Sequence, residues 1–507
     1  MDIIKNTKRN IVYGLINKMV LLVMPFIMRT IINHIFGAEY LGLTSLFNSI
    51  LSVLSITELG ISSALVYNMY EPIANGNQKR VNELLNFYRK AYFVIGLIIF
   101  TVGGLALPFL PHFINGSYPK EINIYVVYLI LLLNASIGYF MYAYKQSLLA
   151  AHQREDVNSK INLVVQLCMQ FLQIVFLIFA RNYYLYVVCL PIFTVANNIW
   201  INTITNRMFP DAKCEGQLDK EILRKIKKLV WGTFIQKFSQ VTRNSFDSIC
   251  LSLYVGLVIT GIYTNYYTIF SMLLAIFMVF NTALAGGIGN HVAVKSIEEN
   301  FEEMKRLDFL YMTFTGWCTI CLLCLYQPFM TIWMGDDMLL PFSVVVLICV
   351  YFYLLKMGDM RALYSSAAGL WWFHRKRSIS ETILNIVLNF TLGYFWGIYG
   401  ILLATIISIF CCNIVWGSLI VFEKYFNREM LKVYFGYHIK YILVTLCALF
   451  VTYFAVNYIQ FNSIIITFLL KGLVSAILPI IIYFMIYFKT SIFKNSLKYI
   501  TTRRKII

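Results

Sequence analysis

The chain of 507 residues is 59% hydrophobic and only 13% charged, with a mean hydropathy of +0.70. Because soluble proteins carry roughly 25% charged residues, this composition excludes an ordinary soluble domain. The net charge of +18 would suggest nucleic-acid binding in a soluble protein, but here the basic residues lie between apolar segments. We interpret them as topology signals that face anionic membrane lipids, and we expect no nucleic-acid partner.

Apolar runs of about 20 residues recur along the whole chain and predict an all-α integral membrane protein with about fourteen transmembrane helices. The N-terminal segment MDIIKNTKRNIVYGLINKMVLLVMPF has a basic start and no small-residue cleavage site, which predicts a retained first helix instead of a signal peptide. The predicted spans are 11–36, 43–68, 87–112, 122–148, 159–180, 184–208, 229–254, 259–287, 309–334, 341–367, 378–396, 398–422, 438–457 and 464–488.

Basic residues divide unequally between the two sides of this topology. The N-terminal and C-terminal tails and the even-numbered connections hold 33 of the 42 lysines and arginines, whereas the odd-numbered connections hold only Lys120 and Arg181. Positively charged loops stay in the cytoplasm, so both termini are predicted to be cytoplasmic. The outer connections are all short, which leaves no room for an extracytoplasmic catalytic domain. We therefore expect a transporter and not an enzyme.

The segment QKFSQVTRNSFDS, Gln236 to Ser248, is polar although it lies within the predicted span 229–254. If it were a loop, every later basic connection would change sides, so charge parity predicts a seventh membrane helix. Gln236, Gln240, Arg243 and Asp247 recur at helical spacing and form one stripe of that helix.

An internal repeat is indicated at an offset of 219 residues. Asn17-Lys18 then aligns with Gln236-Lys237, Gly37 with Gly256, and Gly42 with Gly261. Six helices precede the repeat, so the halves share an orientation and would be related by an axis along the membrane normal. The predicted division is an N-terminal six-helix bundle (1–208), a cytoplasmic linker (209–228), a C-terminal six-helix bundle (229–422), and helices 13 and 14 with a basic cytoplasmic tail (423–507).

Ten charged residues lie more than three residues inside a predicted span, and among them cations outnumber anions by four. Charged residues closer to a span end are counted with the connections. Each of the ten costs at least about 2.5–3.5 kcal/mol at the bilayer centre, which implies a polar interior. A cavity of this charge prefers an anion, and arginine and lysine suit phosphate. The ten residues are Lys18, Arg29, Lys237, Arg243, Lys356, Arg361, Lys471, Glu58, Asp247 and Asp359.

Structural roles for several of these charges stay open. Arg243 and Asp247 are four residues apart and Lys356 and Asp359 three apart, so each pair can neutralise itself. Lys471 can extend its ammonium group to the interface. Arg361 is interpreted either as a cavity residue or as an interfacial anchor near Trp371 and Trp372.

No cofactor or metal site is expected. The sequence LAGGIGN (284–290) lacks the Lys-Ser/Thr of a phosphate-binding loop, and the six histidines show no metal-ligand spacing. Cys318, Cys321 and Cys324 lie in an apolar helix and are interpreted as structural. Glu58, Asp247, Asn265, Lys356 and Asp359 are the candidates for a cavity or ion-coupling role, with a proton gradient, a sodium gradient or the membrane potential as the alternatives.

Three sequence stretches carry a family resemblance: FGAEYLGLTSLFNSILSVLSITELGISSALVYNMYEPIA (36–74), YRKAY (88–92) and SLLAAHQREDVNSKI (147–161). They resemble the Wzx-type polysaccharide and O-antigen flippases of the multidrug/oligosaccharidyl-lipid/polysaccharide exporter superfamily. The resemblance implies two six-helix bundles around a central cavity. It also implies that Lys18, Arg29, Lys237 and Arg243, on helices 1 and 7, bind a diphosphate.

The substrate implied by this resemblance is an undecaprenyl-diphosphate-linked oligosaccharide, moved to the outer leaflet of the bacterial inner or plasma membrane for O-antigen, lipopolysaccharide, capsule or exopolysaccharide synthesis. A polysaccharide polymerase and a chain-length regulator are the implied protein partners, with membrane lipids around the chain. Two alternatives stay open: a multidrug or cation exporter of the same superfamily, and a flippase for the peptidoglycan precursor. A membrane polymerase or ligase is disfavoured because such enzymes need a substantial outer loop.

Overall fold

The computed structural model describes residues 23–58, 61–116 and 118–496, and these residues form helices and connections with no β-strand. Nine of the described helices are long and apolar enough to cross a membrane, and a bent helix pair makes a tenth. The all-α prediction is confirmed, and the chain is a multi-pass membrane protein. Contacts divide it into two compact units, Met1–Thr264 (unit 1) and Asn265–Ile507 (unit 2).

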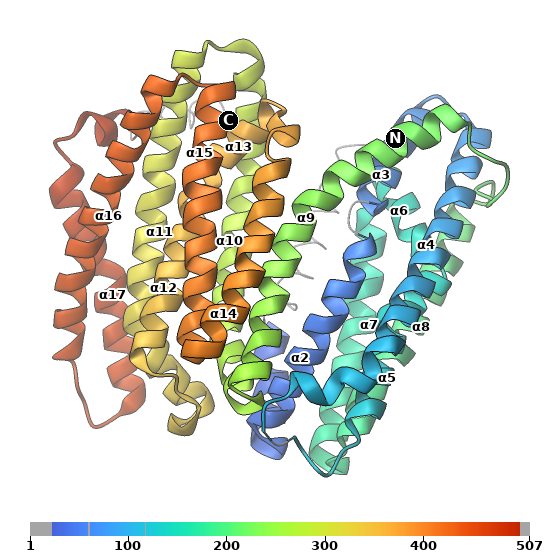
Figure 1. Ribbon diagram of the computed structural model, residues 1–507, viewed down its shortest axis with the longest axis horizontal. Coiled ribbons are helices and arrows are strands. Elements are labelled where there is room, and N and C mark those ends of the chain that lie inside the picture. The colour runs from blue at the N-terminus through green and yellow to red at the C-terminus, as the bar shows by residue number, and fades with distance from the viewer. Residues whose placement is uncertain (1–22, 59–60, 117, 497–507) are drawn as a thin grey trace. The chain divides into compact units, whose positions relative to one another are not determined.

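Unit 1 contains the helices of the first half of the chain together with the polar seventh helix (Figure 1). Its elements are Val23–Phe36, α2 (Ala38–Leu54), η1 (Ser55–Glu58), α3 (Ile61–Ala74), α4 (Gln78–Ala106), η2 (Leu107–Phe113), α5 (Ile124–Phe140), α6 (Tyr144–Ala151), α7 (Glu155–Val175), η3 (Phe176–Ala180), α8 (Tyr183–Met208), α9 (Lys220–Tyr254) and the start of α10 (Leu257–Val294).

Unit 2 contains the rest of α10 and all later helices. These are α11 (Ile297–Met334), η4 (Asp336–Met338), α12 (Phe342–Met357), α13 (Asp359–Ala367), η5 (Leu370–Trp372), α14 (Arg375–Ser408), the π-helical η6 (Ile409–Trp416), α15 (Gly417–Lys424), α16 (Arg428–Asn457) and α17 (Ile464–Tyr487).

The helices follow the predicted spans in chain order, which supports about fourteen crossings. The single long segment Leu370–Lys424 covers the two predicted spans 378–396 and 398–422. Gly397 interrupts it with a non-helical backbone (φ 53°, ψ −129°), and the residues before and after the break pack against each other. The turn predicted between these spans is therefore confirmed. A glycine suits this position because positive φ carries no Cβ penalty there.

Two predicted spans are less regular than the sequence suggested. The span 43–68 was predicted as one helix, but α2 ends at Leu54 and continues as the tighter 3₁₀ turn η1. The span 122–148 is broken between α5 and α6, with a bend of 52°. The backbone N–H groups of Met141 and Ala143 both donate to the carbonyl of Gly138, which ends the regular α-helical pattern.

Side chains cap several helices at the short connections. The Asn123 carboxamide oxygen accepts hydrogen bonds from the backbone of Tyr125 at the start of α5, and Asn182 plays the same role for α8. Ser296 and Glu299 form a reciprocal capping box at the start of α11. Each such cap satisfies backbone donors that would otherwise lack a partner and contributes about 1 kcal/mol. The sequence thus determines where these helices begin.

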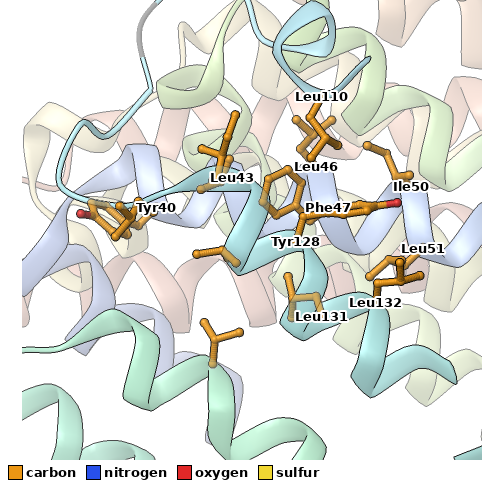
Figure 2. Packing of buried hydrophobic residues seen from close by; sticks show 14 of the residues in the cluster. Tyr40, Leu43, Leu46, Phe47, Ile50, Leu51, Leu110, Tyr128, Leu131 and Leu132 are labelled. Atoms are coloured by element: carbon orange, nitrogen blue, oxygen red, sulfur yellow. The ribbon is translucent and has the colours of Figure 1, made fainter. Parts of the chain in front are cut away.

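The apolar core of unit 1 is centred on α2 and α5 (Figure 2). Phe47 and Tyr128 meet edge to face with ring centroids 5.3 Å apart, and Leu43, Leu46 and Leu132 are buried beside them. Aromatic pairs of this geometry add about 0.5–1.5 kcal/mol to the burial of their surface. This packing fixes α2 as a central element of unit 1.

Unit 2 is organised around α11. In an apolar 18-residue stretch of α11, 67% of the residues are buried, whereas the corresponding fraction for α17 is 11%. Helix α11 is therefore central and α17 peripheral. Helices α16 and α17 lie side by side (Figure 1) and both pack against α11. Their outward faces expose large apolar side chains such as Phe450 and Leu473. A helix that exposes such a face is suited to lipid contact.

The compact units do not follow the predicted bundle boundary. The prediction placed the linker at 209–228, whereas the contacts divide the chain inside α10, between Thr264 and Asn265. The physical reason is that α9 packs against α2, α3, η1 and η2 of unit 1. Because the predicted division rests on the sequence repeat and not on contacts, it stays a prediction.

Candidate functional site

Helix α9 carries the polar segment Gln236–Ser248 without interruption, so the helix predicted there is confirmed. Part of its polar surface packs inside unit 1: Thr242, Ser245 and Ser248 are buried. These small hydroxyl side chains can bond to carbonyls of their own helix, which lowers the cost of burying them. Hence the polarity of α9 serves protein packing as well as any ligand.

The predicted diphosphate-binding residues are only partly described. Lys18 lies outside the described residues, and so does the side chain of Lys237, although its backbone belongs to α9. Arg29 and Arg243 are described and half-buried. The three positions whose backbone is described, Arg29, Lys237 and Arg243, belong to unit 1. Whether the four residues form one anion site stays a prediction.

Arg29 reaches the start of α10. Its Nη2 donates to the hydroxyl of Thr264 at 2.5 Å and lies 3.4 Å from the carbonyl oxygen of Gly261. Thr264 in turn donates to the same carbonyl of Gly261. These hydrogen bonds hold the guanidinium in place with neutral acceptors, so the positive charge of Arg29 is positioned without being cancelled by these two groups.

Arg243 and Asp247 lie one helical turn apart on α9. Asp247 is only 3% exposed, whereas Arg243 is half-buried. A buried carboxylate is costly unless a cation or donor accompanies it. The two roles considered for Arg243, neutralising Asp247 or binding a diphosphate, therefore stay open.

Glu58 lies at a cavity inside unit 1. Its carboxylate accepts a hydrogen bond of 2.5 Å from the hydroxyl of Tyr139 on α5. Both residues line a cavity of about 490 Å³ together with side chains of α7 and α8. The sequence singled out Glu58 for its charge, and its place at a cavity agrees with a role there, although that role stays a prediction.

Lys356 and Asp359 form an ion pair in unit 2. The Nζ of Lys356 lies 2.7 Å from Oδ2 of Asp359. Asn281 on α10 donates to the same oxygen at 3.2 Å, and the Tyr311 hydroxyl on α11 also donates to it. The self-neutralising interpretation of this pair is thus realised. Asn265, the first residue of unit 2, is fully buried.

Arg361 is not an interfacial anchor. It is 3% exposed, and its guanidinium donates to the carbonyl and side-chain oxygens of Asn413, each at 2.8 Å, and to the hydroxyl of Ser418 at 2.9 Å. The π-helical turn η6 departs from the regular α-helical hydrogen-bond pattern. Arg361 donates to the backbone carbonyl of Asn413 within this turn. The anchor interpretation is wrong because these acceptors lie inside the protein.

Two buried polar clusters were missed in the sequence. His438 on α16 lies 2.8 Å from Asp308 on α11, and neither side chain is more than 1% exposed. Lys145 donates to the side chains of Asn202 and Asn206. Lys145 and His438 lie at the ends of predicted spans and Asp308 lies next to one, where polar residues are expected, so no sequence signal singled them out. Among the described residues, no group of three His, Cys, Asp or Glu side chains could hold a metal ion.

Comparison with known proteins places this fold among membrane transporters. No protein-family model matches the sequence, and no curated protein sequence matches it either. The structure is similar to the lipid II flippase MurJ in an inward closed conformation, with a TM-score of 0.68 and 15% identity over 94% of this chain and 99% of that one. It is also similar to an inward-facing multidrug-resistance MATE transporter of the MOP superfamily, with a TM-score of 0.60 and 14% identity over 83% and 99% of the two chains.

A third similar structure is a MOP-superfamily transporter from Pyrococcus furiosus, described as having a binding pocket of reversed polarity. It has a TM-score of 0.54 and 12% identity over 85% of this chain and 97% of that one. At these identities the similarity shows a shared fold. The chain therefore has the fold of MOP-superfamily flippases and exporters.

Proposed function

We propose that this protein is a flippase that moves an undecaprenyl-diphosphate-linked oligosaccharide from the cytoplasmic to the outer leaflet of a bacterial plasma membrane. The observation that carries the proposal is the combination of a flippase fold with excess positive charge on the first helix and α9. The MATE fold alone would fit a drug exporter equally well. A cation exporter, however, needs an anionic or aromatic pocket, and the charge within the spans has the opposite sign.

The diphosphate is the part of the substrate that most needs protein contacts within the membrane. Lys18, Arg29, Lys237 and Arg243 supply cationic donors for its oxygens. Arginine binds phosphate oxygens with two parallel hydrogen bonds, and lysine contributes a compact charge. The isoprenoid tail stays in the lipid. Binding the anion relieves repulsion among these cations, which gives the ligand a different affinity for the two conformations of the carrier.

Coverage of the chain favours a lipid-linked substrate over a drug. The match to MurJ extends over 94% of the chain. Helices α16 and α17 together hold 54 of the 507 residues (30 plus 24), which is more than the unmatched 6%, so the match includes part of them. The MATE match extends over 83% and leaves room for both to lie outside it. A flippase for an isoprenoid-linked substrate has a use for extra lipid-facing helices beside a twelve-helix core, because its ligand carries a long apolar chain.

The similarity to the lipid II flippase supports a second candidate, transport of the peptidoglycan precursor. The sequence motifs EYLGL (39–43) and ELGI (58–61) favour the polysaccharide branch instead. Both candidates use the same cationic diphosphate site and differ in the attached sugar. The two candidate functions are therefore distinguished by which saccharide the protein accepts.

Complementation distinguishes the candidates. The chain is expressed in one bacterial strain that lacks its O-antigen flippase and in another that is depleted of its peptidoglycan-precursor flippase. We expect restored surface polysaccharide in the first and no rescue of growth in the second. Rescue of the second strain alone would establish the alternative. A third strain lacking its multidrug exporters tests the remaining candidate, and restored drug resistance there would contradict both flippase proposals.

A further inference from the structure

The cavity beside Glu58 is lined by an unusual number of amide side chains. Side chains of η1, α5, α6, α7 and α8 and the turn before α6 line an open cavity of about 490 Å³, within the range of about 300–1,000 Å³ that is typical of small-molecule sites. Six amides contribute to its lining: Asn134, Gln146, Asn162, Gln166, Asn197 and Asn198. Such a concentration inside a bundle of membrane helices requires a reason, because unpaired amides are costly in an apolar medium.

Some of these amides lack the partners that burial demands. The side-chain oxygens of Asn197 and Asn198 are buried and accept no hydrogen bond from any described residue. Thr194 donates to Asn134 at 2.7 Å, and Asn198 donates to the backbone carbonyl of Thr194 at 2.9 Å. The protein thus orients part of the lining while leaving acceptors open. A polar occupant, a ligand or water, is needed to satisfy them.

The cavity lies near the middle of its helices. Thr194 and Asn198 are the twelfth and sixteenth of the 26 residues of α8, and Gln166 is the twelfth of the 21 residues of α7. At 1.5 Å per residue this position is close to the centre of a bilayer. Carrier proteins bind their substrates at this depth.

The lining chemistry fits an uncharged ligand rich in hydroxyl groups. A carboxamide offers two donors and an acceptor oxygen, which matches hydroxyls that both donate and accept. A bound cation would require several oxygen ligands and repel the amide N–H groups. Glu58 is the one carboxylate in the described lining, and its charge is already engaged by Tyr139. The cavity therefore favours neutral polar groups over ions.

We propose that this amide-lined cavity of unit 1 is a saccharide subsite, which binds the hydroxyl and acetamido groups of the first sugar next to the diphosphate. The inference rests on the proposed flippase function and adds the element that reads the sugar. Amides that line a binding site discriminate strongly between sugars, because a ligand that lacks the matching hydroxyl leaves buried polar groups unpaired.

The test compares two probes on the purified full-length protein in lipid nanodiscs: undecaprenyl diphosphate and undecaprenyl-diphosphate N-acetylglucosamine. Binding is measured for the wild type, for the near-isosteric variants Asn197→Leu and Gln166→Leu, and for the control Thr203→Val. Thr203 is an exposed residue of α8 whose hydroxyl bonds only the carbonyl of Ile199 in its own helix. Thermal stability is recorded for each variant so that a folding defect is recognised.

We expect the wild type to prefer the sugar-bearing lipid. Each cavity variant should weaken binding of that lipid roughly three- to tenfold, as expected for one lost hydrogen bond, and leave undecaprenyl diphosphate binding unchanged. Thr203→Val should match the wild type for both probes. Unchanged binding of both lipids to stable Asn197→Leu and Gln166→Leu proteins would overturn the saccharide subsite.

Other outcomes are equally decisive. If the wild type binds both lipids with equal affinity, the diphosphate proposal survives and the saccharide subsite is wrong. If it binds neither, the flippase proposal fails and the subsite fails with it. If the cavity variants lose binding of radioactive sodium ions while retaining the sugar preference, the cavity is a cation site instead.

Discussion

Gly42 on α2 and Gly261 on α10 make reciprocal backbone contacts. A Cβ atom on Gly42 would overlap the carbonyl oxygen of Leu257, and one on Gly261 would overlap that of Ala38. The offset of 219 that relates Gly42 to Gly261 also relates Ala38 to Leu257. The glycine of each repeat thus contacts the first residue of the equivalent helix in the other repeat. A local two-fold axis produces this arrangement.

The same symmetry extends to the preceding turns, because Gly37 and Gly256 both have positive φ, 90° and 102°. Glycine adopts this conformation without strain. The repeat read from the sequence therefore has a structural counterpart at this crossing. It is defined by backbone conformation and close approach as well as by residue identity.

Substitution of either crossing glycine should destabilise the protein. We expect Gly42→Ala and Gly261→Ala to lower stability by about 1–3 kcal/mol, because the new methyl group meets backbone that cannot rotate away. The measurement is thermal unfolding of the purified protein in detergent. Gly286→Ala, in an open position of the same helix α10, is the control and should be neutral or stabilising. Equal stability of all three variants would contradict the close crossing.

The Lys356–Asp359 pair predicts a characteristic double-mutant cycle. Removing one partner leaves a charge in a largely buried site, so Lys356→Met should destabilise unit 2 by about 3–5 kcal/mol. Asp359→Asn should cost less, because Asn281 and Tyr311 keep an acceptor there. The double variant should be more stable than Lys356→Met alone. Transport by a stable double variant would exclude Asp359 as the coupling residue, whereas loss of transport would support it.

Arg361 should be irreplaceable by lysine. Its Nη1 donates to the Asn413 carbonyl and the Ser418 hydroxyl, while its Nη2 donates to the side-chain oxygen of Asn413. A single ammonium nitrogen cannot occupy both donor positions. We expect Arg361→Lys to lower stability by on the order of 3 kcal/mol, since hydrogen bonds from a buried charged group are lost. The exposed Lys376→Met is the control. A melting temperature of Arg361→Lys within a degree or so of the wild type would refute the bridging role.

The His438–Asp308 contact should hold α16 against α11. Both side chains are almost fully buried, so Asp308→Leu leaves the imidazole without its partner. Hydrogen exchange followed by mass spectrometry should show faster exchange in α16 of this variant, with α4 in unit 1 unchanged. Uniformly faster exchange through the chain, or none at all, would mean that the pair has no local role.

Much of the fold could be predicted because its signals are local in sequence. Apolar runs and charge parity identified Gln236–Ser248 as a helix, and the boundary between the predicted spans 378–396 and 398–422 coincides with the turn at Gly397. The bend after Phe140 escaped prediction because the sequence nearby offers only one glycine, Gly138, within a continuous apolar run, and a single glycine is tolerated inside a helix.

The buried polar sites could not be predicted in the same way. Arg361 finds its acceptors more than fifty residues away, in a π-helical turn that has no sequence signature. The amides of the cavity lie on separate helices and look scattered in the sequence, so only folding brings them together. Charge drew attention to Glu58, but no pattern in the chain pointed to Asn197.

The central claim is that cations of the first helix and α9 carry a diphosphate-linked saccharide across the membrane. The most direct test is translocation of a fluorescent undecaprenyl-diphosphate-linked saccharide in proteoliposomes by the wild type and by Arg243→Ala, at matched protein levels and with folding checked by thermal unfolding. We predict rapid translocation by the wild type and at least a tenfold slower rate for a folded Arg243→Ala protein. No translocation by the wild type, or equal rates for the two proteins, would contradict the account.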